Sequence, residues 1–164
     1  AFLLIAREAE GGLPADDFAV NTVVHDEIER AETLLGDKPI KLELIENATF
    51  CLHAPSKVVG ILLGNLIRNA VSYTDQGFVR VTIDQGQVRI EDSGIGLSDE
   101  DLKQVFKPFF RAQHGRRGGH GVGLSIVKRM SDRFRWPIEL TSQAGVGTSV
   151  TVKFPDFAIV ECRS

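Results

Sequence analysis

Two glycine-punctuated loops constrain this 164-residue chain more than any other feature. The first, DSGIG at 92–96, ends the alternating stretch VRIED, and the second, GGHGVGL at 118–124, opens the apolar-periodic stretch LSIVKRM. Between them lies FKPFFR, then a basic, glycine-rich run without apolar periodicity. A strand that ends in a carboxylate, a basic loop and a glycine-led helix start together predict a nucleotide pocket with a lid.

Composition excludes several classes of protein. Hydrophobic residues make up 43% and charged residues 25% of the chain, as in a globular domain with a real core. The net charge of -3 offers no basic surface, so nucleic acid is not an expected partner. No apolar run approaches the ~20 residues that span a bilayer. Cys51 and Cys162 have no metal-like or redox-like spacing, so we expect two inert thiols in a reducing compartment.

Hydrophobic periodicity predicts the order of the helices and strands. Helices are expected at about 2–10, 21–35, 55–73, 98–106 and 121–134. Strands are expected at 41–46, 49–54, 78–84, 87–92, 137–143 and 148–154. We expect the first two strands to form a hairpin or lie side by side. This order predicts an α/β sandwich with an antiparallel or mixed sheet and helices on one face.

The helix from Pro55 to about Tyr73 is apolar over most of its length, so we expect it to be buried. Asn65, Asn69 and Ser72 share one of its faces. An asparagine oxygen is a suitable ligand for Mg²⁺, which takes its other ligands from water and nucleotide phosphates. The alternative is that these amides cap or bridge neighbouring strands, and the residues alone leave both interpretations open.

Each glycine loop also has two interpretations. Asp92 can accept a hydrogen bond from an exocyclic amine, which selects adenine over guanine, while Gly94 and Gly96 let the backbone approach a ligand closely. The alternative for 92–96 is an ordinary turn. The loop 118–124 can direct backbone N–H groups at a polyphosphate, or it is a flexible loop before a helix. It is neither a Walker loop nor a dinucleotide fingerprint.

The run between the two loops combines aromatic and basic residues. Its aromatic residues are Phe106, Phe109 and Phe110, which we expect to be hydrophobic plugs and not a stacking platform for bases. Its arginines, Arg111, Arg116 and Arg117, suit phosphate binding, although any one of them could simply be solvated.

Taken together, four stretches resemble the signature boxes of sensor histidine kinases. NLIRNAVSYT, EDSGIG, FKPFFR and GGHGVGLSIVKRM follow the order of the family's N, first-glycine, F and second-glycine boxes, and GVGTSVTVKFP resembles its last turn and strand. The resemblance covers about 16–155. It implies the Bergerat-type ATP-binding fold, a two-layer sandwich with a mixed sheet, about three helices on one face and a mobile ATP lid.

The resemblance implies a role for each matching residue. Asn69 would coordinate Mg²⁺, and Asn65 would assist at the phosphates. Asp92 would bind the adenine amine, with Tyr73 packed near the base. The other nucleotide contacts would be Gly94, Gly96, Gly119, Gly121, Gly123, Leu124 and Thr148. The γ-phosphate charge would be stabilised during transfer by Arg111, Arg116 or Arg117.

Three residues depart from the family's pattern. Ser72 stands where many members have a Lys or Arg that reaches the phosphates, Lys107 replaces an acidic residue of the F box, and His120 replaces a small residue. None of these changes removes the pocket. They put the rate of transfer and the nucleotide affinity in question.

The phosphoacceptor histidine is expected outside this chain. His25 is followed by acidic residues, as in the acceptor box, but lacks that box's proline and lies in the domain's own first helix, so we expect a surface residue. Residues 1–12 resemble the end of a dimerisation helix and its linker, 13–157 the catalytic domain and 158–164 a tail.

The expected function is binding of Mg-ATP and donation of its γ-phosphate to a histidine on a dimerisation domain, for relay to an aspartate of a response regulator. This chain would be a monomeric cytoplasmic piece of a homodimeric, inner-membrane bacterial sensor. Alternatives are a gyrase-, mismatch-repair- or chaperone-type ATPase, and a Ser/Thr-directed anti-sigma kinase. The ATPases place a Glu base where this chain has Asn65. A degenerate interaction module without nucleotide is disfavoured by Asn69 and Asp92.

Overall fold

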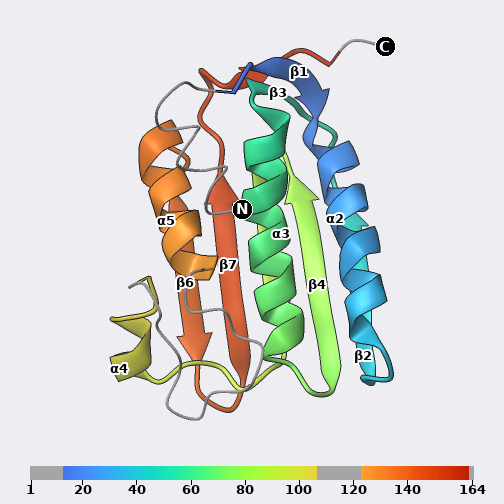
Figure 1. The fold of residues 1–164 in the computed structure, drawn as a ribbon, viewed down its shortest axis with the longest axis vertical. Helices are drawn as coiled ribbons and strands as arrows, with labels where there is room; N and C mark the ends of the chain where they lie inside the picture. The colour runs from blue at the N-terminus through green and yellow to red at the C-terminus, as the bar shows by residue number, and fades with distance from the viewer. Residues whose placement is uncertain (1–12, 107–122, 163–164) are drawn as a thin grey trace.

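The computed structural model describes residues 13–106 and 123–162 (Figure 1). The elements in chain order are β1 (Asp16–Ala19), α2 (Val20–Leu35), β2 (Ile40–Glu46), β3 (Cys51–Ala54), α3 (Ser56–Ser72), β4 (Gly77–Asp84), β5 (Gln87–Asp92), α4 (Asp99–Leu102), α5 (Gly123–Phe134), β6 (Ile138–Gln143), β7 (Gly147–Lys153) and β8 (Ile159–Val160). The helix expected at 2–10 lies outside the described residues. None of the helices within the two described ranges has the length and apolarity that a membrane crossing requires.

A five-stranded mixed sheet forms one layer of the fold. Its strand order is β2-β4-β5-β7-β6, with β2 parallel to β4 and the other neighbours antiparallel. Helices α2, α3 and α5 lie side by side over one face of this sheet (Figure 1). The predicted two-layer sandwich with a mixed sheet and helices on one face is therefore confirmed, with α4 as a short additional helix.

The central helix is buried as expected. The buried hydrophobic residues of α3 are Val58, Val59, Leu62, Leu63, Leu66, Ile67, Ala70 and Val71. They pack in one core with the inward-facing residues of the sheet, among them Val79, Val81 and Ile90. This packing fixes the position of α3 against the sheet, and with it the side chains that α3 directs toward α5.

The expected pairing of 41–46 with 49–54 is wrong. The first stretch, β2, pairs in parallel with β4, whereas the second, β3, belongs to a separate three-stranded sheet of order β1-β3-β8. Asn47 follows β2, and its N–H donates to the Ile83 carbonyl at 2.8 Å while its side chain donates to Asp84 Oδ1 at 2.8 Å. The residue after β2 therefore remains hydrogen-bonded to β4 and does not begin a hairpin turn. Alternation predicts a strand but does not specify the strand with which it pairs.

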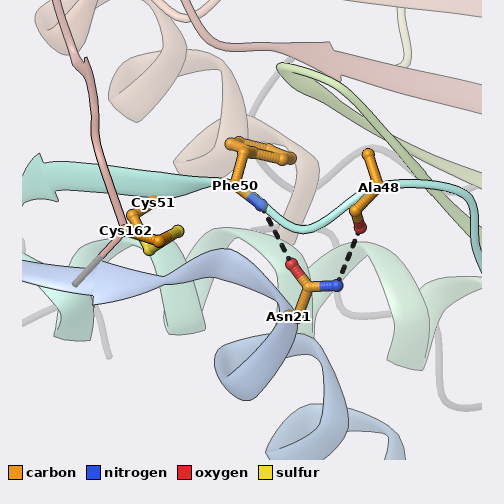
Figure 2. The surroundings of a disulfide bond; sticks show 5 residues. All are labelled: Asn21, Ala48, Phe50, Cys51 and Cys162. Carbon is orange, nitrogen blue, oxygen red and sulfur yellow. Dashed lines mark hydrogen bonds between the residues drawn. A yellow bond between two sulfur atoms is a disulfide. The ribbon is translucent and has the colours of Figure 1, made fainter. Parts of the chain in front are cut away.

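The prediction of two free thiols is also wrong. Cys51 and Cys162 form a disulfide with a Cα–Cα distance of 5.2 Å, shown in Figure 2. Antiparallel pairing of β8 with β3 places Val160 opposite Cys51, which brings the following residues to the same sheet. Because the two cysteines lie 111 positions apart, their spacing in the sequence did not indicate that they pair. Because the two thiols are paired, they give no reason to expect a reducing compartment.

The start of α2 is tied to the same region. Asn21 is buried, and its side chain donates to the Ala48 carbonyl at 3.0 Å and accepts from the Phe50 N–H at 3.4 Å (Figure 2). The ring centroids of Phe50 and Phe154 lie 6.0 Å apart, and those of Phe154 and Trp136 lie 5.3 Å apart. The small sheet is therefore joined to the main core by aromatic contacts, while the disulfide ties β3 to the chain after β8 within the small sheet.

Candidate functional site

Two predicted site residues lie at the end of α3, Asn69 in its last turn and Tyr73 directly after it, and a lysine from another segment holds this end. Lys38 Nζ donates to the carbonyls of Val71 at 3.0 Å and Thr74 at 3.3 Å. A cation at the carboxyl end of a helix meets both the free carbonyls and the negative end of the helix dipole. Lys38 thereby holds the end of α3, where Asn69 and Tyr73 lie.

Asp92, the last residue of β5, is oriented by two backbone groups. Its Oδ1 accepts hydrogen bonds from the N–H of Gly94 at 2.9 Å and from the N–H of Thr148 at 3.3 Å. The carboxylate therefore uses one oxygen within the protein. The lining of the adjacent pocket includes Asp92, so its second oxygen is the one that a ligand's donor can reach.

The loop after Asp92 is fastened to three different segments. Its Ile95 N–H donates to the Tyr73 carbonyl at the end of α3 at 3.2 Å. The Ile95 carbonyl accepts from the Gly145 N–H at 2.7 Å. The Leu97 N–H donates to Ser142 Oγ at 2.7 Å. These bonds fix the loop between α3 and the turn that joins β6 to β7.

The glycines of this loop are required by the chain's own backbone. A Cβ on Gly94 would overlap the carbonyl of Tyr73, and a Cβ on Gly96 would overlap the carbonyl of Gln143. Gly96 also has a φ of 69°, which favours glycine. We expected these glycines to make room for a ligand, and the structure gives a different reason for their small size.

A pocket opens between α3, α5 and the carboxyl end of β5. Its lining residues are Leu66, Asn69, Ala70, Tyr73, Ile90, Asp92, Gly96, Leu97, Val105, Leu124, Leu140, Thr148 and Val150. Most of them are apolar, with polar groups from few residues. A largely apolar pocket with one carboxylate suits an aromatic base with an amine.

Burial changes the acidity of the carboxylate in this pocket. Loss of solvent raises the pKa of Asp92 from 3.8 to about 6, although the hydrogen bonds from the N–H groups of Gly94 and Thr148 act in the opposite direction. Asp92 is therefore ionised at neutral pH and can accept a hydrogen bond from a donor group of a ligand. A perturbed group of this kind in a pocket is a mark of a functional site.

Comparison with known families identifies the family of this chain. The sequence model of the family described as histidine kinase-, DNA gyrase B-, and HSP90-like ATPase (HATPase_c) matches residues 56–158. The chain belongs to this family. The matched range contains α3, β5, α5 and β7, which supply most of the pocket lining.

The relatives of this HATPase chain are sensor kinases. The autoinducer 2 sensor kinase/phosphatase LuxQ of Vibrio cholerae is 30% identical over 135 residues, which are 74% of this chain and 16% of LuxQ. The sensor-like histidine kinase SenX3 of Mycolicibacterium smegmatis is 27% identical over 158 residues, 91% of this chain and 41% of SenX3. The chain thus spans less than half of either relative, and the predicted resemblance to sensor histidine kinases is confirmed.

A solved structure has the same fold as this HATPase chain. The full-length structure of ShkA in complex with AMPPNP superposes with a TM-score of 0.73 at 23% identity, over 87% of this chain and 31% of ShkA. The likeness at this identity establishes the common fold.

The structure brings some predicted residues of the HATPase site together and leaves others outside the pocket. The predicted residues that line it are Asn69, Tyr73, Asp92, Gly96, Leu124 and Thr148. Among the described residues, Asn65 and Gly94 are not part of the lining, and Gly123 is the first residue of α5. The predicted residues that lie outside the described ranges are Lys107, Arg111, Arg116, Arg117, Gly119, His120 and Gly121.

The sequence prediction missed two kinds of residue. The apolar lining residues Leu66, Ile90 and Val150 could have been found, because they lie at helical or alternating spacing from predicted polar residues. Ser142 could not, since its role depends on folding. Its hydroxyl accepts from Leu97, lies 2.8 Å from Thr148 Oγ1 and bonds the Gly147 carbonyl at 3.1 Å.

The residues present fit a magnesium nucleotide. No group of three or more His, Cys, Asp or Glu residues that could hold a metal occurs within 13–106 and 123–162. A metal at this pocket would therefore take few ligands from the described residues and more from a bound phosphate chain and water, as Mg²⁺ commonly does. Asn69 supplies an amide oxygen in the lining. One turn earlier, the buried Nδ2 of Asn65 has no hydrogen-bond partner among the described residues.

The described histidines lie on the surface. The His25 side chain is 57% exposed, with Nε2 at 3.1 Å from Glu46 Oε1, and that of His53 is 58% exposed beside Asp17. Neither residue is in the pocket lining. The expectation that His25 is a surface residue agrees with this position.

Proposed function

We propose that this HATPase domain binds Mg-ATP and donates its γ-phosphate to a histidine on a dimerisation domain outside the chain. The observation that carries the nucleotide part is the partly buried Asp92 carboxylate, which lines a largely apolar pocket with one oxygen held by two backbone N–H groups. Phosphoryl donation to histidine is supported by the two relatives named above, both of which are sensor kinases.

Adenine is the base that the pocket chemistry favours. Asp92 offers an acceptor, and the exocyclic amine of adenine is a donor, whereas guanine presents a carbonyl oxygen at the corresponding position. Placing that oxygen against a buried carboxylate would leave two acceptors facing one another. The apolar side chains of Ile90, Leu140 and Val150 would cover the faces of the ring.

The phosphate end of the nucleotide is assigned to the part of the pocket that Asn69 lines. Its amide oxygen would hold Mg²⁺, and the bound ion would supply positive charge against the phosphate oxygens. Leu124 lies in the first turn of α5, whose N–H groups and dipole favour an anion. We assign Arg111, Arg116 and Arg117 to the γ-phosphate, with the family's glycine loop as a lid.

Histidine-directed transfer is favoured over an ATP-hydrolysing machine by one residue. The family's description also covers gyrase B-like and HSP90-like proteins. Hydrolysis needs a general base for the attacking water, and position 65 carries the amide of Asn65, which is not basic. We therefore assign the γ-phosphate to an external acceptor and not to water.

The partners follow from this assignment. We propose that the acceptor histidine lies on the protein's own dimerisation domain, that the phosphoryl group passes to an aspartate of a response regulator, and that the intact protein is a homodimer. The proposed place of this domain is the cytoplasmic side of a bacterial inner membrane, in line with its sensor relatives.

Trans-labelling tests the proposed reaction. The chain is mixed with the protein's histidine-bearing dimerisation domain and ATP radiolabelled in the γ-phosphate. We expect acid-labile label on the added domain and little on this chain, and loss of labelling with Asn69→Ala. Stable labelling of His25 in this chain, or release of inorganic phosphate without label on the added domain, would contradict the proposal.

A further inference from the structure

A buried carboxylate lies between α2 and α3, away from the nucleotide pocket. The Glu27 side chain of α2 is 5% exposed. The facing surface of α3 has glycine at two positions, and a Cβ on Gly64 would overlap Glu27 Oε1 while one on Gly60 would lie 3.5 Å from Oε2. The two glycines therefore form the recess that receives this carboxylate.

Two arginines share the two oxygens of Glu27. Arg30 Nη1 lies 2.6 Å from Oε2, and Arg68 Nη1 lies 3.8 Å from Oε1. Burial raises the pKa of Glu27, and the charges of Arg30 and Arg68 oppose that rise. A buried carboxylate is kept in place by such partners, since losing either leaves a poorly compensated charge. Arg30 is the more exposed of the two arginines, with 70% of its side chain exposed against 40% for Arg68.

Arg68 connects this carboxylate to a predicted site residue. Its Nη2 donates to Asn65 Oδ1 at 3.2 Å. An amide group has a donor end and an acceptor end, and a partner on one end fixes where the other points. Because Arg68 can only donate, it commits the oxygen of Asn65 and turns Nδ2 to the other side.

The Nδ2 of Asn65 is buried without a hydrogen-bond partner among the described residues. A buried donor without an acceptor is costly, so a site for an acceptor is expected next to it. Asn65 is not part of the pocket lining, but it lies one turn before Asn69 on the same face of α3, and Asn69 lines the pocket. The missing acceptor is thus expected from the ligand of that pocket.

We propose that Arg68 is a positioning residue, anchored by Glu27, that presents the Asn65 N–H group to an oxygen of the nucleotide's phosphate chain. The inference rests on the proposed function, since it needs a nucleotide in the pocket. It assigns a binding role to a charged cluster on the far side of α3. It also assigns a use to Gly60 and Gly64, which make room for the anchor.

The test compares two ligands that differ in their phosphates. Binding of ADP and of adenosine, each with Mg²⁺, is measured by NMR titration for the unaltered chain and for Arg68→Met. We expect ADP to bind about three- to tenfold more weakly in the variant, which corresponds to one hydrogen bond, with adenosine unchanged. The ratio of the two affinities separates this effect from a general loss of structure, which would weaken both ligands.

Arg30→Met is the matched control. It removes the same charge from the same carboxylate but makes no bond to Asn65, so the ADP-to-adenosine ratio should stay that of the unaltered chain. Asn65→Ala should reproduce the Arg68→Met ratio, and the double variant should be no worse than either single one. Arg68→Lys, which keeps a positively charged donor group, should restore part of the ratio.

Three results would overturn the inference. Equal ratios in Arg68→Met and the unaltered chain would do so, as would an Arg30→Met ratio that falls as far as that of Arg68→Met. Additive effects of the Asn65 and Arg68 variants would show that the two residues act separately. If the unaltered chain bound neither ligand, the proposed function itself would fail. If the unaltered chain bound both ligands and Arg68→Met left the ADP-to-adenosine affinity ratio unchanged, only the positioning role would be rejected.

Discussion

Asp92 Oδ1 accepts a hydrogen bond at 3.3 Å from the backbone N–H of Thr148, a residue 56 positions further along the chain. The bond joins the end of β5 to β7, where the two residues face each other in the antiparallel register. It holds the carboxylate in one orientation without neutralising it. The carboxylate is thus ready for a ligand's donor before any ligand arrives, which reduces the cost of ordering on binding.

Replacing the carboxylate by its amide should separate stability from binding. A pKa raised from 3.8 to about 6 corresponds to a cost of about 3 kcal/mol for the ionised form at neutral pH, at about 1.4 kcal/mol per pKa unit. Asp92→Asn keeps an oxygen for the two backbone donors and removes the charge. We expect the unliganded chain to gain about 1–3 kcal/mol in its free energy of unfolding, measured by urea denaturation at pH 7.5.

The same substitution should weaken adenine binding at least about tenfold. With its oxygen on the backbone N–H groups, the Asn amide would turn an NH₂ group toward the adenine amine, so two donors would meet. Asp156→Asn, at an exposed position, is the control and should change neither quantity. A variant that lost stability, or that bound adenosine as well as the unaltered chain does, would refute the assignment of Asp92.

The pH dependence should have opposite signs for folding and for binding. Because the pKa of Asp92 is raised on folding, its contribution to stability is present below pH 3.8 and is lost as the pH rises through about 6. Binding needs the carboxylate, so adenosine affinity should rise over the same interval. Adenosine is chosen because phosphate groups titrate in this range. Fluorescence or NMR titrations between pH 5 and 8 measure the adenosine affinity. An affinity that did not change with pH would be inconsistent with our account.

How far the sequence predicted the fold depended on the range of each contact. The pairs β4–β5 and β6–β7 are hairpins closed by short turns, and local alternation predicted both. The first turn contains Gly86, which has a φ of 77°. The parallel pairing of β2 with β4 and the pairing of β8 with β3 join segments far apart in the chain. No local pattern specifies such partners, which is why the expected first hairpin was wrong and the disulfide was missed.

The candidate site divides in the same way. Chemically distinctive residues such as Asn69 and Asp92 were predicted, because amides and carboxylates in apolar surroundings stand out in a sequence. Lys38 and Ser142 were not, although both hold the site together. Each bonds to backbone carbonyls or N–H groups of distant segments, and those atoms are present in every residue. Only the folded backbone reveals which of them are close.

Two glycines near the pocket should differ strongly in their tolerance of alanine. Gly96 and Gly145 have similar positive φ angles, 69° and 80°, but a Cβ on Gly96 would overlap the Gln143 carbonyl while one on Gly145 would meet no atom within 4 Å. Gly145→Ala should therefore cost about 1–2 kcal/mol in the free energy of unfolding. Gly96→Ala should cost at least about 2 kcal/mol more, by urea denaturation. Equal costs would show that the contact with Gln143 is absent.

The disulfide should contribute measurably to stability. A cross-link between residues 111 positions apart removes much of the freedom of the unfolded chain, and native disulfides typically contribute about 2–5 kcal/mol. We expect Cys162→Ser to lower the free energy of unfolding by this amount. Cys162 is the residue to replace, because Cys51 is buried and a serine there would add a second effect.

Reduction provides the control for that variant. The unaltered chain in a thiol reductant should unfold at the same urea concentration as Cys162→Ser, and the variant should be insensitive to the reductant. Identical midpoints for the oxidised and the reduced unaltered chain would show that the bond does not stabilise the fold.

The central claim is that the pocket beside Asp92 binds an adenine nucleotide. The most direct measurement is calorimetric titration of the unaltered chain with ADP and with GDP, both in Mg²⁺, followed by ADP with Asp92→Ala. We predict saturable binding of ADP, at least about tenfold weaker binding of GDP, and no detectable ADP binding by the variant. Equal affinity for the two nucleotides, or unchanged ADP binding by Asp92→Ala, would contradict the account.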